Sequence, residues 1–504
     1  MPRRLDAVAL ASFMVAALGG LAAIAAAEAL TAMGEGVRVA LLCTALAVVA
    51  VLPALVSMSR QAGRFDLMHP LFFAAWFFFL PQFVVVMLLF AMRRDETFFG
   101  LYLADPMRAR VTALELAIVG SLGLSAGYLL PLGRRLGAVL PHIRALETSG
   151  RPARLLAVLL LAVGLFGAIG AFSTGLLGYQ GAEHISRFGA LFANLSGLLV
   201  AAEAFIFFSL FRRRAGWRTL TLAAVAAALG LAAVSGSRGA LFYPALAMVA
   251  SYQYSRERFR FRHVVAWGLI LAASLWAGMV AGSAFRGVKT DLMGRSERLS
   301  VHGVIEVQRD AARELGNASL AYTIRFGWER IVERLDGVTS LGVIVTRAPG
   351  LAAAERDWRI DRNIVRDAAT ALVPRFLWPD KPVVGVSQQI GELYFDLEDS
   401  SPAVTFMGDL FRNFGTAGVF PGMLLIGVAL RAVYVWLIER WPLSPLRVGL
   451  FLMISGATNY EGLFSTYFPT LIRALAVAIL ALALARAAVL VHSAPSGEKA
   501  PLAG

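Results

Sequence analysis

Residues 367–382 read DAATALVPRFLWPDKP, and they lie within a polar interruption, residues 285–408, of an otherwise apolar chain. Three prolines rigidify this stretch, and aromatic, cationic and acidic side chains stand close together in it. Apolar runs flank the interruption on both sides. We therefore expect the interruption to form a partly helical cap in water over a bundle of apolar helices.

The composition is that of a membrane protein. Of the 504 residues, 58% are hydrophobic and only 16% are charged, whereas a soluble protein carries about 25% charged residues. Several apolar runs reach the ~20 residues that cross a bilayer as a helix, and they lack the alternation of barrel strands. The fold class that follows is an all-α polytopic membrane protein. Its single cysteine, Cys43, excludes an intrachain disulfide.

Hydropathy predicts about 12 transmembrane helices. They cover residues 7–31, 37–57, 69–92, 111–131, 154–173, 190–211, 218–234, 239–254, 264–284, 410–437, 446–463 and 468–490. The seventh and eighth are the weakest pair, because the run from Gly239 to Tyr254 is short and the turn before it is tight. The first apolar run, Ala7 to Leu30, is long for a signal peptide, which favours a retained helix.

Arginine clusters predict the orientation of the bundle. They precede the first span and follow each even-numbered span except the last, as at Arg3, Arg60, Arg134, Arg212, Arg256 and Arg440. If the N-terminus is cytoplasmic, the positive-inside rule places every cluster on the cytoplasmic side. This excess of basic residues accounts for much of the net charge of +14, so nucleic acid is not implied as a partner. Both termini are expected in the cytoplasm.

The chain then divides into four parts. These are membrane helices one to nine in 1–284, an extracytoplasmic catalytic loop with short helices in 285–408, membrane helices ten to twelve in 409–491, and a disordered cytoplasmic tail in 492–504. Apolar residues at helical spacing predict an amphipathic helix in the loop that ends near Gly337. These residues are Leu320, Ile324, Trp328, Ile331 and Leu335.

Two arginines beside glycines are expected at the outer ends of spans. Arg238 lies in SGSRG, and Arg286 lies in GSAFRG. Glycines allow a ligand to approach closely, the start of a helix offers free N–H groups, and a guanidinium matches phosphate oxygens. Each arginine alone is equally explained as a snorkelling anchor at a turn. As a pair they fit a diphosphate better than either does alone.

The segment VPRFLWPDKP contains several candidate ligands in ten residues. Arg375 and Lys381 are candidates for binding a diphosphate, while Trp378 and Asp380 are candidates for binding a sugar, since an aromatic ring can stack on its face. The alternative is a rigid structural turn whose aromatic residues seal against the bilayer.

Two further stretches contain candidate carboxylates. Asp336 closes ERIVERLDG at the end of the amphipathic helix, where an acidic group is unfavourable, so an arginine or a function should hold it. Arg334 is a candidate for binding substrate, although charges at this spacing also form surface ion pairs. In GDLFRNFGTAGV, Asp409 is a candidate N-cap or base, Arg412 a candidate diphosphate ligand and Asn413 a candidate substrate ligand.

Motifs of nucleotide and metal chemistry are missing from the sequence. There is no Walker loop, no dinucleotide fingerprint, no HExxH and no cluster of histidines at metal-binding spacing. We therefore expect no cofactor and no metal. Tyr460 and Glu461, near the outer end of the eleventh span, form a lesser candidate site.

The order of these motifs resembles that of the Wzy-type polymerases, which join O-antigen and other oligosaccharide repeat units in bacterial polysaccharide synthesis. The resemblance rests on GSRG at an outer turn, PRFLWPDKP late in the long loop and NFGTAGV after it. It covers about Val234 to Gly422, and the earlier spans match only in kind.

The resemblance implies a C-type membrane glycosyltransferase on the outer face of the bacterial inner membrane. Its donor and acceptor would be undecaprenyl-diphosphate-linked repeat units. Arg238, Arg286 and Arg375 would stabilise the diphosphate leaving group, and Asp336 or Asp409 would deprotonate the acceptor hydroxyl. Membrane lipid, a chain-length regulator and a flippase are the further partners that it implies.

Two other functions stay open at this point. An O-antigen ligase shares the architecture and is expected to use a histidine with arginines, and only His302 lies in the long loop. A flippase for lipid-linked oligosaccharides predicts repeated half-domains and charges inside the bundle, neither of which is visible in the sequence.

Overall fold

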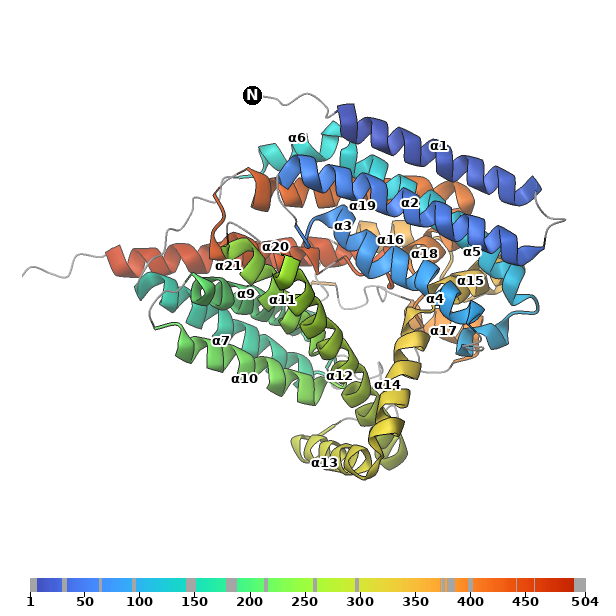
Figure 1. Ribbon diagram of the computed structural model, residues 1–504. Helices are drawn as coiled ribbons and strands as arrows, with labels where there is room; N and C mark the ends of the chain where they lie inside the picture. Colours follow the sequence, from blue (N-terminus) through green and yellow to red (C-terminus); the bar gives the residue numbers. More distant parts are fainter. Residues whose placement is uncertain are drawn as a thin grey trace, which may run out of the picture.

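The computed structural model describes most of the chain. It covers residues 7–29, 34–62, 66–92, 97–141, 151–177, 188–212, 216–256, 261–294, 299–371, 373, 377–378, 386–397, 402–440, 442–456 and 458–493. All regular structure in these residues is helical, and they contain no strand (Figure 1).

Eleven helices of the described residues are long and apolar enough to cross a membrane, which confirms a multi-pass helical protein. They are α1 (Ala7–Ala29), α2 (Glu35–Ala62), the continuous α3, η2 and α4 (Pro70–Ala91), α5 (Pro106–Leu129), α7 (Arg151–Ser173), the pair α8 and α9 (Gly189–Phe211), α10 (Arg218–Ser235), α12 (Phe261–Met293), α15 (Gly337–Asp357), α19 with η5 (Thr416–Glu439) and α21 (Phe464–Ser493).

The remaining helices are shorter. They are η3 (Phe98–Tyr102), α6 (Pro131–Val139), α11 (Phe242–Ser255), α13 (Val301–Asn317), α14 (Leu320–Leu335), α16 (Asn363–Thr370), α17 (Ser387–Phe395), α18 (Phe406–Phe414) and α20 (Pro445–Ser455). The amphipathic helix predicted to end near Gly337 is α14, and its bounds agree with that prediction.

The structure corrects the predicted spans at four helices. Helix α11 has 14 residues and α20 has 11, so both fall short of the ~20 residues that cross a bilayer. Helix α12 continues to Met293, past the boundary predicted at residue 284. Helix α15 is a candidate span inside the segment predicted as an outer loop. The other ten predicted spans each correspond to a candidate helix.

The long helices form two groups that α19 and α21 join (Figure 1). One apolar core contains residues of α1, α2, η2, α5 and the first half of α19. The other contains residues of α7, α9, α10, α11 and α20. Helix α21 contributes its first turns to one core and its later turns to the other, which fixes the two groups relative to each other.

Glycines bring α5 and α19 into direct backbone contact. A methyl group on Gly127 of α5 would lie 2.0 Å from the carbonyl oxygen of Leu424, and one on Gly427 of α19 would lie 2.2 Å from that of Leu124. Membrane helices associate largely through such small residues, because lipid supplies no hydrophobic drive between them. This contact holds the C-terminal helices against the N-terminal group.

A buried carboxylate that follows the C-terminal end of α2 joins the two groups of helices. Asp66 is 1% exposed and accepts hydrogen bonds from the hydroxyl groups of Tyr254 at 3.0 Å and Tyr434 at 2.7 Å, and from the amide of Gln253 at 2.9 Å. These donors come from α11 and α19. A buried charge needs this many donors to offset the loss of water.

Helices α13 and α14 form an arm that extends from the bundle after α12 and returns at α15 (Figure 1). Helix α13 packs against the end of α12 through Val304, Val307 and Ala311, which contact Phe285 and Val288 in one apolar cluster. Helix α14 then brings the chain back to η2 and to the start of α15.

The α5–α19 contact predicts the effect of two matched substitutions. Gly127→Ala forces α19 away from α5 and should lower the free energy of unfolding by ~1–3 kcal/mol. Gly268→Ala on α12 meets nothing within 4 Å and should be neutral or stabilise by up to ~1 kcal/mol. Thermal unfolding of the purified variants in detergent measures both, and equal midpoints would contradict the packing account.

Candidate functional site

The turn between α10 and α11 is fixed by Arg286. Helix α10 ends at Gly236, whose φ of 57° is left-handed and favours glycine. The Arg286 guanidinium Nε donates a hydrogen bond of 2.8 Å to the Gly236 carbonyl. The structure therefore brings together Arg238 and Arg286, the two arginines that the sequence singled out.

Two further glycines press this turn onto α12. A methyl group on Gly278 would lie 2.5 Å from the carbonyl oxygen of Arg238, and one on Gly282 would lie 3.0 Å from its Cα atom. The Gly-x-x-x-Gly spacing was visible in the sequence, but its packing partner was not. Because the backbone of Arg238 rests directly on α12, its side chain starts from a fixed position.

Two arginines of α14 complete a cluster of positive charge. The charges of Arg286, Arg334 and Arg330 all act on the Arg238 guanidinium, and Glu333 opposes them. We call Arg238, Arg286, Arg330 and Arg334 the arginine cluster. Arg334 was a candidate from the sequence, whereas Arg330 was not.

Two carboxylates among the described residues pair with arginines of the cluster. Arg330 pairs with Glu333 at 2.7 Å, and Arg334 pairs with Glu461, which also accepts a 2.6 Å hydrogen bond from Gln82. The guanidinium groups of the cluster are positive and a diphosphate diester is negative, so the two are opposite in sign.

Arg238 is the member of the cluster best placed to receive an anion. Its side chain is half-buried, its buried Nε has no hydrogen-bond partner among the described residues, and it takes part in none of their ion pairs. Burial, followed by the charges of the other three arginines, lowers the pKa of Arg238 to about 10. Arg238 therefore stays charged at neutral pH.

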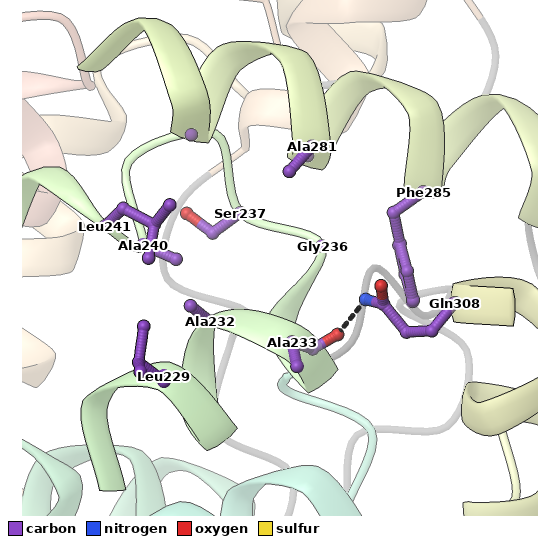
Figure 2. A pocket seen from close by; sticks show the side chains of 12 residues that line it. Leu229, Ala232, Ala233, Gly236, Ser237, Ala240, Leu241, Ala281, Phe285 and Gln308 are labelled. Carbon is purple, nitrogen blue, oxygen red and sulfur yellow. Dashed lines mark hydrogen bonds between the residues drawn. The ribbon is translucent and has the colours of Figure 1, made fainter. Parts of the chain in front are cut away.

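An apolar pocket of about 170 Å³ lies beside the turn (Figure 2). Leu229 and Ala232 of α10, Ala281 and Phe285 of α12, and Gln308 of α13 line it. Gln308 donates a hydrogen bond to a backbone carbonyl of α10, as Figure 2 shows, and so ties the arm to the pocket.

Asp336 is buried at the junction of α14 and α15. It is 1% exposed and acts as the N-cap of α15, accepting hydrogen bonds from the Thr339 backbone N–H at 3.0 Å and from the Thr97 hydroxyl. Burial raises the pKa of Asp336 above its usual range, and these hydrogen bonds oppose the rise. Its role as a base stays a prediction, and the capping role explains its position without one.

Asp409, Arg412 and Asn413 lie together in a buried network. The Arg412 side chain is 1% exposed and pairs with Asp409 at 2.9 Å and with Glu355 at 3.1 Å. Asn413 donates to Asp409 at 3.1 Å, and Asp409 also accepts from the backbone N–H of Ser465 at 2.8 Å. We call Asp409, Arg412, Asn413 and Glu355 the buried network.

The buried network joins α15, α17 and α18 to one another and contains no member of the arginine cluster. Glu355 belongs to α15, and it also accepts a 2.7 Å hydrogen bond from Tyr394 of α17. The predicted N-cap, Asp409, lies one turn inside α18, and Thr405 caps that helix instead. Since two carboxylates already neutralise Arg412, we do not include it in the proposed anion site.

The segment after α20 connects the two clusters of charge. Its Glu461 side chain pairs with Arg334, and its Glu461 carbonyl accepts a 3.1 Å hydrogen bond from the Thr405 N–H. Four residues later, the Ser465 N–H binds Asp409. The lesser candidate from the sequence, Glu461, is therefore the residue that contacts the arginine cluster.

The remaining predicted residues are only partly placed. Trp378 is 40% exposed. Arg375, Asp380 and Lys381 lie outside the described residues. The described part of the chain contains no group of three or more His, Cys, Asp or Glu side chains that could hold a metal ion.

Models of known protein families, curated proteins and solved structures gave no significant match to the chain.

The buried network predicts unequal effects for two similar substitutions. Glu355→Gln breaks a pair whose carboxylate side chain is 5% exposed, and it should lower the free energy of unfolding by about 3–5 kcal/mol. Glu329→Gln breaks an exposed pair with Arg325 and should cost about 0–1 kcal/mol. Thermal unfolding in detergent compares the stabilities of the two variants. Similar losses of stability would mean that the buried network does not hold α15, α17 and α18 together.

Proposed function

We propose that this protein is a membrane glycosyltransferase that polymerises oligosaccharide repeat units linked to undecaprenyl diphosphate, as the resemblance to Wzy-type polymerases implies. The observation that carries the proposal is the arginine cluster. It joins the outer turn at Arg238 to α14, beside the end of a candidate membrane span and an apolar pocket. A lipid diphosphate presents its charge at the same boundary between lipid and water.

The cluster would act on the leaving group. The acceptor hydroxyl oxygen bonds to the anomeric carbon of the donor sugar, and the bond from that carbon to the diphosphate oxygen breaks. The electron pair leaves on the diphosphate, where Arg238 and its neighbours stabilise the developing charge. The hydroxyl proton passes to a carboxylate.

The partly exposed carboxylates that pair with the arginine cluster are better candidates for this base than the buried Asp336 and Asp409. Asp336 and Asp409 are 1% and 0% exposed, and hydrogen bonds occupy both. The Glu333 and Glu461 side chains are 39% and 24% exposed and lie beside the arginines. His302, the residue that a ligase would need, instead pairs with Glu306 on the exposed face of α13.

Purified protein with a synthetic undecaprenyl-diphosphate oligosaccharide, and no nucleotide sugar, tests the proposal. Products spaced by one repeat unit are the expected result. Transfer of glycan only onto an added lipid A core would indicate a ligase. Movement of the lipid across a vesicle bilayer without elongation would indicate a flippase, and either outcome would overturn the proposal.

Three arginine substitutions compare the arginine cluster with the surface of the same protein. Arg238→Ala should lower the rate of elongation by at least about 100-fold, since it removes charge stabilisation from the leaving group. Arg238→Lys should also be impaired, because lysine lacks the planar bidentate fork. Arg325→Ala removes an exposed arginine of α14 and should keep normal activity. Equal rates for Arg238→Ala and Arg325→Ala would exclude the cluster from catalysis.

A further inference from the structure

One side of α14 carries large apolar side chains that remain exposed. Leu320 is 74% exposed, Ile324 is 52% exposed and Trp328 is 38% exposed. Their spacing of four residues places them on one face of the helix. We call these three residues the α14 stripe. An apolar stripe of this kind on a protein surface usually marks a contact with a partner or a membrane.

The point at which α14 crosses α12 indicates whether a partner protein or the membrane covers the α14 stripe. The two helices cross where Gly327 lies against Trp276 and Val280. Helix α12 is a candidate span that begins beside the basic residue Arg262. At a rise of 1.5 Å per residue, Trp276 lies about 21 Å and Val280 about 27 Å from Arg262 along the helix axis.

These heights lie within the hydrocarbon core of a bilayer, which is about 30 Å thick. If Arg262 marks one boundary of that core, the crossing lies in the opposite leaflet. Any tilt of α12 only moves the crossing towards the centre of the membrane. Helix α12 itself carries an exposed apolar side chain that would face lipid, Leu269, which is 67% exposed.

The faces of α14 separate lipid from charge. At 100° per residue, the stripe lies within about 100° of Gly327 on one side of the α12 contact. Arg330 and Arg334 lie within about 60° of Gly327 on the other side. The exposed ion pair of Arg325 and Glu329 occupies the face opposite the contact. An apolar face with tryptophan beside a charged face is typical of an interfacial helix.

We propose that the α14 stripe inserts into the phospholipid leaflet on the side of the arginine cluster, so that α14 is an interfacial helix between lipid and the cluster. The proposal rests on the position and exposure of α14, and it does not depend on the reaction that the protein catalyses.

Site-directed spin labelling tests this proposal in the full-length protein. The substitution Cys43→Ala removes the single cysteine, and Leu320→Cys and Ile324→Cys then place one label each on the stripe. Arg325→Cys and Glu329→Cys place matched labels on the charged face. All four positions are exposed, so the labels should not disturb packing, and elution as a single species checks this.

The labelled proteins are reconstituted into vesicles of phosphatidylethanolamine and phosphatidylglycerol. Oxygen concentrates in hydrocarbon, whereas a nickel chelate stays in water, so the ratio of label relaxation by the two reagents reports on depth. Labels at 320 and 324 should give ratios several-fold above those at 325 and 329, and Leu269→Cys on α12 serves as the reference for a label in lipid.

Two results would overturn the proposal. If the nickel chelate relaxes the labels at 320 and 324 as strongly as those at 325 and 329, the stripe lies in water. If neither reagent reaches 320 and 324, protein covers the stripe, either from a second copy of the chain or from another partner.

Discussion

Repulsion between guanidinium groups is the constraint on which the candidate site depends. Like charges at short range raise the free energy of the folded protein, and flexible loops would let them separate. Here the backbone prevents this, because Gly278 and Gly282 seat the turn of Arg238 on α12, and Arg286 is bound to the carbonyl of Gly236. An anion between the arginines would relieve this repulsion, which supports the diphosphate site proposed above.

Helices α15 and α18 hold the other half of the arginine cluster in place through buried polar groups. Arg412 with its two carboxylates joins α15 to α18, and the Ser465 N–H ties the segment of Glu461 to them. Glu461 in turn holds Arg334. A series of polar contacts thus connects the buried network to the arginine cluster. Removing these charges from water costs free energy, and their mutual pairing offsets that cost. Loss of one partner would therefore leave an uncompensated buried charge and destabilise the arrangement.

Much of the membrane fold could be predicted from sequence, because apolar runs of sufficient length have few alternatives in lipid. The proximity of Arg238 and Arg286 was also predictable, since both lie beside glycines and their spans were expected to end on the same side of the membrane. Contacts between residues that lie far apart in the sequence could not be predicted. Asp336 looked misplaced at the end of one helix because the start of the next at Gly337 was not recognised. Arg412 looked free for a ligand because Glu355, 57 residues earlier, gave no local signal. Helix α15 carries charges at both ends of a short apolar stretch, which concealed it within the polar segment.

The most direct test of the arginine cluster is a comparison of two lipids that differ by one phosphate. Undecaprenyl diphosphate and undecaprenyl monophosphate are added separately to purified wild type and to Arg238→Ala, and the rise in unfolding temperature is measured. The account predicts that the diphosphate stabilises the wild type more than the monophosphate does, and that Arg238→Ala removes this difference. Equal stabilisation by both lipids, or an unchanged difference in the variant, would contradict a diphosphate site at Arg238.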